Sequence, residues 1–448
     1  MSETIFAPAS GPGPAGIAVI RVSGPAAGAA LRRLTGLTVP TPRRATRARI
    51  VDDEGETIDM GLVLWFPAPA SFTGEDVAEL HVHGGRAVVA GVLQALAAVD
   101  GLRVAEPGEF TRRAFENDKF DLTAAEAIAD LVHAETLAQR RQAVRQMEGG
   151  LGRLYDGWRE RLIRLLAYQE ALIDFADEDL PPETAERVRA EVVPLAAEMS
   201  DHLADNRRGE RLREGFRIAI VGPPNAGKSS LLNVLARREA AIVAAVPGTT
   251  RDVIEVHLDL AGYPVLLADT AGLRETAEAV EQEGVRRSFM TAEQADLKLV
   301  VVEITKVSEV DETTAALVDD DALLVVNKCD HAAPAAPMVV NGVAAIPISA
   351  RTGAGIPGLL SRLESEVTRR WGAGEGVALT RVRHRQALER CAVCLERVVA
   401  ADAELVAGAS ETVAEDLRLA IRELGRITGR VDVEDILGVI FRDFCIGK

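Results

Sequence analysis

The segment GPPNAGKS at residues 222–229 decides which fold the chain is predicted to contain. An apolar run at 216–221 before it predicts a strand, and residues 230–236 after it predict a helix. In this order the three form a P-loop, whose backbone N–H groups turn toward a phosphate while the helix N-terminus adds its dipole. Lys228 supplies a charge to the β- and γ-phosphates, and the Ser229 hydroxyl is a predicted Mg²⁺ ligand. A nucleotide-binding α/β domain is therefore expected here.

Two segments further along have the composition expected around a γ-phosphate and its Mg²⁺. GTTRD at 248–252 carries Thr250, which we predict as a second Mg²⁺ ligand. DTAG at 269–272 follows a predicted strand at 265–268, so that the Asp269 carboxylate would hold the Mg²⁺ shell. Both segments lie in the order that a GTP- or ATP-hydrolysing domain requires.

The base specificity is predicted from NKCD at 327–330, which follows a predicted strand at 322–326. The Asp330 carboxylate can accept hydrogen bonds from N1–H and the 2-amino group of guanine, and adenine has no such pair of donors. The dipeptide at 349–350, after a predicted strand at 344–348, fits a loop that contacts guanine O6. The domain is therefore predicted to be a GTPase. The residues predicted to bind GTP are Asn225, Ala226, Gly227, Lys228, Ser229, Ser230, Thr249, Thr250, Asp269, Thr270, Ala271, Gly272, Asn327, Lys328, Asp330, Ser349 and Ala350.

The residue after the DTAG segment is unusual for a Ras-like domain. A glutamine at this position orients the attacking water in Ras, but here it is Leu273, which cannot do so. Either hydrolysis is slow or another group takes this role. The residues alone do not choose among the candidates, which are Arg251, Arg274, Glu275, Glu278 and Glu281.

The pattern of residues divides the chain into four stretches, at 1–118, 119–213, 214–375 and 376–448. The first mixes strand patterns at 18–22, 61–66 and 78–82 with a helix at 86–99, typical of a compact α+β domain. The second and fourth are helical, and the third alternates strands and helices. We predict a multidomain protein in which a P-loop α/β domain of Ras-like type is inserted into one discontinuous all-α domain. Two separate helical domains are the alternative.

Composition excludes several classes of protein. The 448 residues carry a net charge of −17, which argues against a general nucleic-acid coat protein, although a local basic groove stays open. The N-terminus lacks the pattern of a signal peptide, and no apolar run reaches the ~18 residues of a membrane span, so we expect a cytoplasmic protein. Cys391 and Cys394 form a C-x-x-C without a second pair, so we expect core residues rather than a zinc site.

Three shorter features were weighed against ordinary structural roles. GPGPAG at 11–16 precedes a predicted strand rather than a helix, so it is interpreted as a loop and not as a dinucleotide fingerprint. His81 and His83 share a strand without a third ligand, which favours structural histidines. The apolar C-terminus, with Cys445 three residues from its end, is either a helix end docked in a groove or a terminus placed in a site.

Long stretches of the chain closely resemble the MnmE (TrmE) family of tRNA-modifying GTPases. The matching segments are the five nucleotide elements above, GIAVIRVSGP at 16–25, SFTGEDVAELHVHGG at 71–85, PGEFTRRAFENDKFDLTAAEAIAD at 107–130 and the terminal FCIGK. The resemblance implies an N-terminal α/β domain that dimerises and binds a tetrahydrofolate, a discontinuous helical domain and an inserted G domain. It also implies a homodimer that works with an FAD-dependent protein of the MnmG (GidA) family, in a heterotetramer or larger complex. Together they would install an aminomethyl-type group on C5 of the wobble uridine of certain tRNAs, with the one-carbon unit supplied by the folate.

Site residues follow from the resemblance by motif position. It implies folate contacts, to 5-formyltetrahydrofolate or a related form, at Arg21, Glu79, Lys119 and Lys448. It implies a K⁺ ion held by Asn225, Ala244, Val246 and Thr249, which would supply the charge of an arginine finger and so account for Leu273. It aligns the water-activating acid with Glu281, and Cys445 is our hypothesis for a covalent participant. Glu283 and Glu303 stand where the family more often has an apolar residue and an Asp.

Other classes explain less of the chain. A ribosome-assembly GTPase would carry a basic RNA-binding appendage, which the sequence lacks. A folate-binding module alone leaves the nucleotide elements unexplained, and a regulatory switch would not need the thiol-bearing tail.

Overall fold

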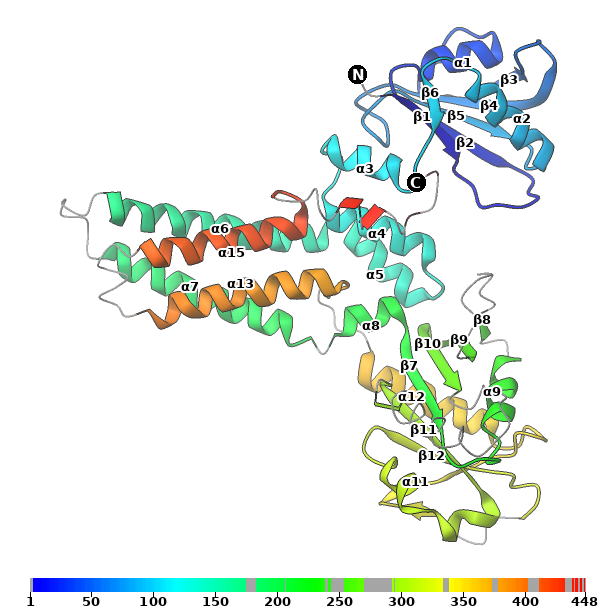
Figure 1. The fold of residues 1–448 in the computed structure, drawn as a ribbon, viewed down its shortest axis with the longest axis vertical. Helices are drawn as coiled ribbons and strands as arrows, with labels where there is room; N and C mark the ends of the chain where they lie inside the picture. The colour runs from blue at the N-terminus through cyan, green and yellow to red at the C-terminus, as the bar shows by residue number, and fades with distance from the viewer. Residues whose placement is uncertain are drawn as a thin grey trace, which may run out of the picture. The chain divides into compact units, whose positions relative to one another are not determined.

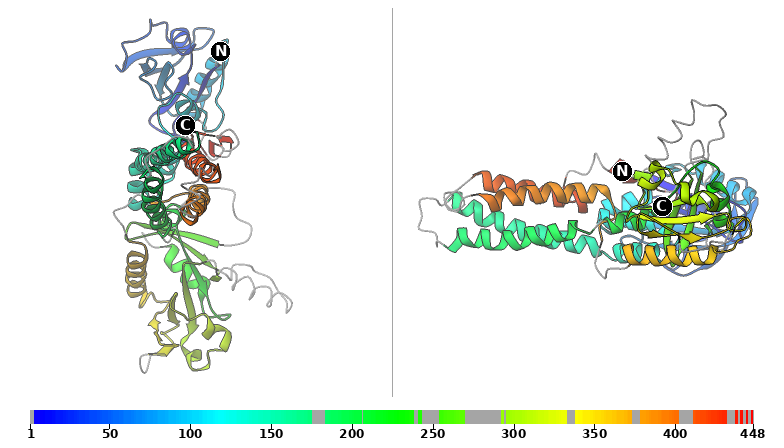
Figure 2. Two further views of the ribbon diagram at one scale, coloured as in Figure 1. Left: turned by 90° about the vertical axis from the view of Figure 1, so that its left-hand side faces the viewer. Right: turned by 90° about the horizontal axis from the view of Figure 1, so that it is seen from below.

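The chain forms two compact units in this computed structural model (Figures 1 and 2). The structure describes residues 3–174, 183–205, 207–237, 241–242, 254–269, 292–293, 295–332, 338–372, 378–401, 411–431, 437–438, 440–441, 444 and 447. Unit 1 comprises Met1–Ala129, Arg145–Met199 and Gln386–Lys448, and unit 2 comprises Asp130–Val144 and Ser200–Arg385.

The N-terminal part of unit 1 is a six-stranded sheet with the order β3-β4-β5-β2-β1-β6. Its strands are β1 (Thr4–Pro8), β2 (Ala18–Ser23), β3 (Thr46–Val51), β4 (Thr57–Phe66), β5 (Val77–Val82) and β6 (Leu102–Val104). Helices α1 (Ala27–Thr35) and α2 (Arg86–Ala97) cover one face, where Ile20, Leu31 and Leu96 are buried in one core. The predicted α+β domain is confirmed, and β4 begins four residues before the predicted strand at 61–66.

The helical part of unit 1 is built from both sides of the inserted domain. Its helices are α3 (Glu109–Glu116), α4 (Leu122–His133), α6 (Gly150–Asp174), α7 (Glu183–Leu203), α13 (Val382–Ala400) and α15 (Glu411–Thr428), and α4, α7 and α13 continue into unit 2. In α6 the buried residues Leu151, Tyr155, Trp158, Leu162 and Leu165 recur every three or four positions and form one apolar face.

Helices from before and after the inserted domain pack together as one bundle. α6 lies along α15, and Cys391 of α13 contacts Met199 of α7 with the two sulfurs 3.7 Å apart (Figure 1). The helical domain is therefore discontinuous, and the alternative of two separate helical domains is wrong. Cys391 and Cys394 are buried in this bundle, as predicted for core residues.

Unit 2 holds a seven-stranded sheet with the order β15-β12-β11-β7-β10-β9-β8. Its strands are β7 (Phe216–Val221), β8 (Ala241–Ile242), β9 (Ile254–Leu260), β10 (Tyr263–Asp269), β11 (Leu297–Glu303), β12 (Ala322–Asn327) and β15 (Ile346–Pro347). β7 pairs in parallel with β10 and β11, and β9 runs antiparallel to β10. The predicted strand at 344–348 is shorter than expected, because Ala344 belongs to β14 (Val343–Ala344), which pairs with β13 (Val339–Val340), and only Ile346 and Pro347 form β15 beside β12.

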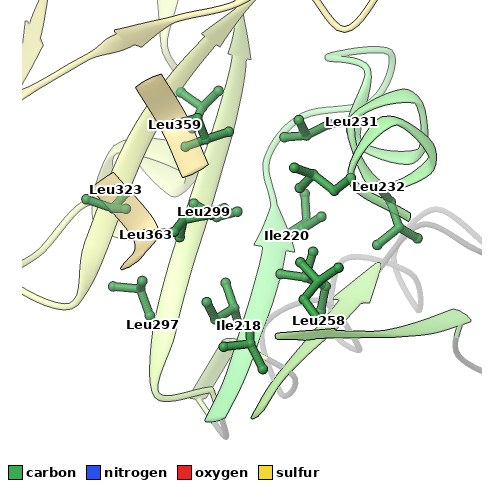
Figure 3. Packing of buried hydrophobic residues seen from close by; sticks show 14 of the residues in the cluster. Ile218, Ile220, Leu231, Leu232, Leu258, Leu297, Leu299, Leu323, Leu359 and Leu363 are labelled. Atoms are coloured by element: carbon green, nitrogen blue, oxygen red, sulfur yellow. The ribbon is translucent and has the colours of Figure 1, made fainter. Parts of the chain in front are cut away.

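Alternating residues of β7 face two apolar layers. Ile218 and Ile220 pack against α9 (Lys228–Ala236) and α12 (Ile356–Trp371), and Figure 3 shows leucines of both helices around them. Ala219 and Val221 belong to the core on the opposite face. A strand buried on both faces reads as a continuous apolar run, which is why 216–221 was recognisable in the sequence.

Unit 2 also includes helices α5 (Leu137–Met147, up to Val144), α8 (Arg208–Glu214) and the short α11 (Glu312–Ala316). None of the helices in the described ranges is both long enough and apolar enough to cross a membrane.

Candidate active site

The P-loop occupies the turn between β7 and α9 that the sequence predicted. Gly222 has φ of 135°, and a Cβ there would lie 2.1 Å from the Val301 carbonyl oxygen. Gly227 has φ of 92°, and a Cβ there would lie 2.3 Å from Nδ2 of Asn327. Both positions combine a positive φ with close contact, so only glycine fits either of them.

The Lys228 side chain is held in place by backbone carbonyl groups of the P-loop. Its Nζ donates hydrogen bonds to the carbonyl oxygens of Gly222 (2.9 Å) and Pro223 (3.0 Å), and the residue is buried. Asn225, at the exposed rim, has φ of 63° in the left-handed region that asparagine tolerates better than most residues. The charged end of Lys228 therefore lies at the loop where the motif places the phosphates.

Asn327 joins the P-loop to the predicted guanine loop. Its Nδ2 donates to the Ala226 carbonyl oxygen (2.9 Å), and its Oδ1 accepts from the Ala350 N–H (3.0 Å). The residue is only 2% exposed, so both bonds are shielded from water. Loops that follow different strands are thus tied together by one amide side chain.

Asp330 is oriented by its neighbours as a carboxylate. Oδ1 accepts a hydrogen bond from the Ser349 hydroxyl (2.6 Å), and Oδ2 lies 2.6 Å from Nη2 of Arg351. The Ser349 hydrogen bond and the nearby charges of Arg351 and His331 hold the pKa of Asp330 below its ordinary value. The group is therefore ionised at neutral pH, as an acceptor for two guanine N–H donors must be.

Lys328 is fixed from the neighbouring strand. Its Nζ lies 2.8 Å from Oε2 of Glu303, the last residue of β11. The hydrogen bond from Lys328, supported by one from Thr305, lowers the pKa of Glu303. Glu303 thus orients a residue of the predicted guanine site, a role that its strand position did not reveal.

Several predicted site residues lie outside the described part of the chain. Asp269 ends β10 beside Ile220 of β7, and only its backbone is described. The others are Ala244, Val246, Thr249, Thr250, Thr270, Ala271, Gly272, Leu273, Glu281, Cys445 and Lys448.

A second candidate site lies in the N-terminal domain, where a cavity of about 330 Å³ is lined by Glu79, Lys119, Phe66 and Phe72 among others. Arg21 donates from Nε (3.1 Å) and Nη2 (3.0 Å) to Oε1 of Glu79, and its guanidinium lies 5.1 Å from the centre of the Phe72 ring. The Lys119 Nζ donates to the Pro69 carbonyl oxygen (2.8 Å). Glu79 and Lys119, distant in sequence, thus line the same cavity, and Arg21 is bound to Glu79.

The C-terminal tail docks against this same domain. Phe441 and Phe444 are buried with Leu122 of α4, and Gly447 lies so close to Pro8 of β1 that a Cβ would be 1.9 Å from the Pro8 carbonyl oxygen. Ala7, the residue before Pro8, pairs with Arg21 across the β1–β2 ladder. The described part of the tail is therefore a docked chain end, and it contacts β1, the strand that pairs with the one carrying Arg21.

The two histidines singled out in the sequence both meet carboxylates. Nε2 of His81 lies 3.3 Å from Oε2 of Glu79, and Nδ1 of His83 lies 2.9 Å from Oδ1 of Asp59. No group of three or more His, Cys, Asp or Glu side chains that could hold a metal occurs within the described ranges. Loop 11–16 leads into β2 rather than into a helix, as predicted.

One charged network was missed from the sequence. A cavity of about 650 Å³ is lined by Glu75, Arg103, Glu109 and Arg113 among others, and these four side chains are linked by ion pairs. In the sequence, the segment at 107–113 was noted only as part of the family resemblance. The spacing of Glu109 and Arg113, four residues apart, was the available signal, because such pairs face each other on a helix.

Comparison with known proteins identifies the family to which the chain belongs. The chain matches the family models described as "MnmE helical domain" over residues 122–445 and "GTP-binding protein TrmE N-terminus" over residues 4–119. The tRNA modification GTPase MnmE of Paramagnetospirillum magneticum is 57% identical over 448 residues, which are 100% of both chains. That of Parvibaculum lavamentivorans is 58% identical, again over 100% of both chains. Among solved structures, the G domain of the T. maritima FeoB iron transporter is 24% identical over 34% of this chain and 97% of its own, with a TM-score of 0.24. Two domain matches and relatives aligned from end to end show that this chain belongs to the MnmE (TrmE) family of tRNA modification GTPases.

Proposed function

We propose that this protein hydrolyses GTP in order to modify tRNA. With an FAD-dependent partner of the MnmG (GidA) family, it would add an aminomethyl-type group, carboxymethylaminomethyl, to C5 of the wobble uridine of certain tRNAs. The observation that carries the GTP part is the link through Asn327 between the P-loop and the loop that holds Asp330 as a carboxylate. The Asn327 side chain would thereby join the phosphate-binding loop and the guanine-binding loop in one site.

Residues of this chain would hold GTP and Mg²⁺ as their positions suggest. Lys228 and the N-terminus of α9 would bind the phosphates, and Ser229 would ligate Mg²⁺ together with Thr250. Asp330 would accept the guanine donors, with Ser349 and Ala350 beside the base. Bound Mg²⁺ supplies charge stabilisation to the transferred phosphoryl group.

A K⁺ ion would take the place of an arginine finger. Asn225 lies exposed at the rim of the P-loop, where its side-chain oxygen can ligate a cation. Ala244, Val246 and Thr249 would complete the ion's ligands, and Glu281 would orient the attacking water that Leu273 cannot. In a homodimer, pairing of two G domains would complete this site.

The N-terminal cavity suits a tetrahydrofolate such as 5-formyltetrahydrofolate. Its wall of Phe66 and Phe72 suits a flat pterin ring, and the Lys119 ammonium suits the carboxylates at the other end of a folate. Arg21 and Glu79 form the polar side of the site. The docking of Gly447 beside β1 supports a role for the C-terminal Lys448 in the same site.

The remaining features belong to the same proposal. The four domains would run over 1–118, 119–213, 214–375 and 376–448, and the protein would work in the cytoplasm. Cys445 is the proposed covalent participant, and full modification activity in Cys445→Ser would remove it from the mechanism.

The K⁺ proposal is tested by GTP hydrolysis in K⁺ and in Na⁺ at equal ionic strength. We expect hydrolysis to be at least tenfold faster in K⁺, because Na⁺ is smaller and fits the same ligands poorly. Asn225→Ala should abolish the difference. Equal rates in the two salts would exclude the K⁺ mechanism and leave the GTPase assignment intact.

The modification proposal is tested by nucleoside analysis of tRNA from a deletion strain. Loss of the C5 group at the wobble uridine, restored by the intact gene, is the expected result. Unchanged wobble uridines in the deletion strain would refute the proposal.

A further inference from the structure

Asp130 of helix α4 binds both ends of the inserted domain. Its Oδ1 accepts hydrogen bonds from Nε of Arg213 (3.1 Å) and from Nη2 of Arg381 (2.7 Å). Arg213 lies in α8, the last helix before β7, and Arg381 lies beyond α12, after the sheet is complete. One carboxylate oxygen therefore holds the chain where it enters the nucleotide-binding domain and where it leaves.

The entering and leaving segments are also bound to each other. A Cβ at Gly209 of α8 would lie 2.1 Å from the Leu379 carbonyl oxygen, so the two backbones are in direct contact. Arg385 pairs with Glu210 (2.8 Å) and with Asp205 (2.7 Å), and all three side chains are at most 15% exposed. The base of the domain, where the chain enters and leaves it, is thus braced by these contacts, and Asp130 is bound to a residue of each segment.

The α4–α5 region also contacts the β9–β10 hairpin. The β9–β10 hairpin follows GTTRD and ends at Asp269, so it lies between the two segments predicted to sense the γ-phosphate. At its turn the Gly262 carbonyl oxygen accepts from the Ala138 N–H of α5 (3.1 Å), and His257 lies 3.2 Å from Glu135. The hairpin is therefore in direct contact with α5 and with the loop between α4 and α5.

The turns of α4 that precede Asp130 pack against Phe441 and Phe444 of the C-terminal tail. Leu122, Ala125 and Ala129 form one cluster with Phe441 and Phe444. Ala129 directly precedes Asp130, and α4 runs without a break from Leu122 to His133 (Figure 1). A helix of 12 residues is about 18 Å long, and it transmits displacement along its axis because every turn is hydrogen-bonded to the next.

We propose that Asp130 is a positioning residue that couples the nucleotide-binding domain, through α4, to the tail that ends at Cys445 and Lys448. The proposal deepens the proposed function and rests on it. GTP hydrolysis shifts the hairpin and the braced base of the domain, and Asp130 passes this shift to α4. The surface of α4 against which Phe441 and Phe444 pack then moves with the helix. Asp130 is not among the residues proposed to bind GTP or folate.

The test compares Asp130→Asn with wild type in the full chain, reconstituted with its FAD-dependent partner and unmodified tRNA. Asn keeps the size of the side chain but loses the charge that binds two arginines. We expect GTP hydrolysis in K⁺ to stay within about twofold of wild type while wobble-uridine modification falls at least tenfold. Asp130→Glu should restore a substantial part of the modification. Modification at the wild-type rate, or an equal fall in both activities, would overturn the proposal.

Asp416→Asn is the matched control, because Asp416 pairs with Arg397 and its side chain is 15% exposed, like that of Asp130. It should keep both activities. If the wild-type protein itself modified no uridine, the proposed function would fail rather than the coupling.

A second measurement does not depend on modification chemistry. Amide hydrogen exchange of α4 should differ between the GDP-bound and GTP-analogue-bound states of the wild type. In Asp130→Asn this difference should disappear. Exchange in α4 that is insensitive to nucleotide in the wild type would contradict the coupling.

Discussion

Asp330 receives its properties from residues that follow it in the chain but lie beside it in space. Ser349 donates to Oδ1 and Arg351 pairs with Oδ2, so the carboxylate is both ionised and fixed in direction. A fixed acceptor loses little entropy on binding guanine, which is how one side chain can select a base.

Asp330→Asn should weaken GDP binding by at least tenfold. The amide replaces one of the two acceptor oxygens with an N–H₂ donor, which faces a guanine donor and leaves it unpaired. Titration with a fluorescent GDP analogue measures the effect. Asp320→Asn, at an exposed aspartate in the loop before β12, should bind normally, and equal affinity in both variants would reject Asp330 as the guanine acceptor.

Glu109 shows how a charged group is stabilised at the start of α3. Burial by itself would raise its pKa, but hydrogen bonds from Arg103, from the Glu106 N–H and from Arg113 hold the pKa below its ordinary value of 4.5. A carboxyl whose pKa is lower in the folded than in the unfolded chain stabilises the fold above the unfolded value. That stability is lost as the pH falls through the folded pKa.

Glu109→Gln should therefore destabilise the protein at pH 7 and have a much smaller effect near pH 3. We expect about 1.5–3 kcal/mol at pH 7, the range for hydrogen bonds to charged groups. Urea unfolding of variant and wild type at the two pH values gives the difference. Glu116→Gln removes a half-exposed ion pair with Arg112 on the same helix, and it should change the free energy of unfolding by less than about 1 kcal/mol. A Glu109→Gln effect that did not shrink at low pH would contradict this assignment.

At the scale of elements, the C-terminal tail makes close backbone contacts with the N-terminal part of the chain, at Gly108 against Phe441 and at Gly447 against Pro8. Gly447 has φ of 99° and sits against Pro8, whereas a Cβ at Gly438 would meet nothing within 4 Å. Gly447 is thus held by backbone contact with β1.

Gly447→Ala should lower folate binding and modification at least tenfold, because the methyl group would push the chain end away from β1. Gly438→Ala is the matched control and should leave both unchanged. Binding of 5-formyltetrahydrofolate by calorimetry and nucleoside analysis provide the two readouts. Normal folate binding by Gly447→Ala would show that the tail is not part of the folate site.

At the scale of the whole molecule, the chain enters and leaves the inserted domain through two segments that contact each other. Gly209 and Leu379 touch, and Cys391 of α13 meets Met199 of α7. An insertion whose ends are in contact can be replaced by a short connection without separating the segments on either side.

A variant in which a short Gly/Ser linker replaces residues 215–377 should therefore still fold. We expect a cooperative thermal transition, the helical content of the α6–α7–α13–α15 bundle and retained folate binding, with GTP binding lost. Circular dichroism and calorimetry measure these properties. Loss of helical structure would mean that the bundle depends on the inserted domain for its stability.

Some of these features were predictable because the information is local in the chain. The P-loop needs a strand, two glycines, a lysine and a helix within a few residues, so GPPNAGKS predicted both the fold and the binding of phosphate. The order of the later motifs predicted a GTPase, and the residue pattern of 119–213 and 376–448 predicted a helical domain. β15 is shorter than the strand predicted at 344–348, because each ladder hydrogen bond depends on a partner strand that the sequence does not specify.

What the sequence determined by itself is therefore the chemistry of each loop, and what the tertiary structure decided is which loops act together. The bond from Asn327 to the P-loop, the meeting of Arg21 with Glu79 and the seat of Gly447 on Pro8 join residues far apart in the chain. The same is true of Asp130 between Arg213 and Arg381. Such contacts follow from the packing of whole layers, because a hydrogen bond forms only between groups that the buried core has already brought within reach.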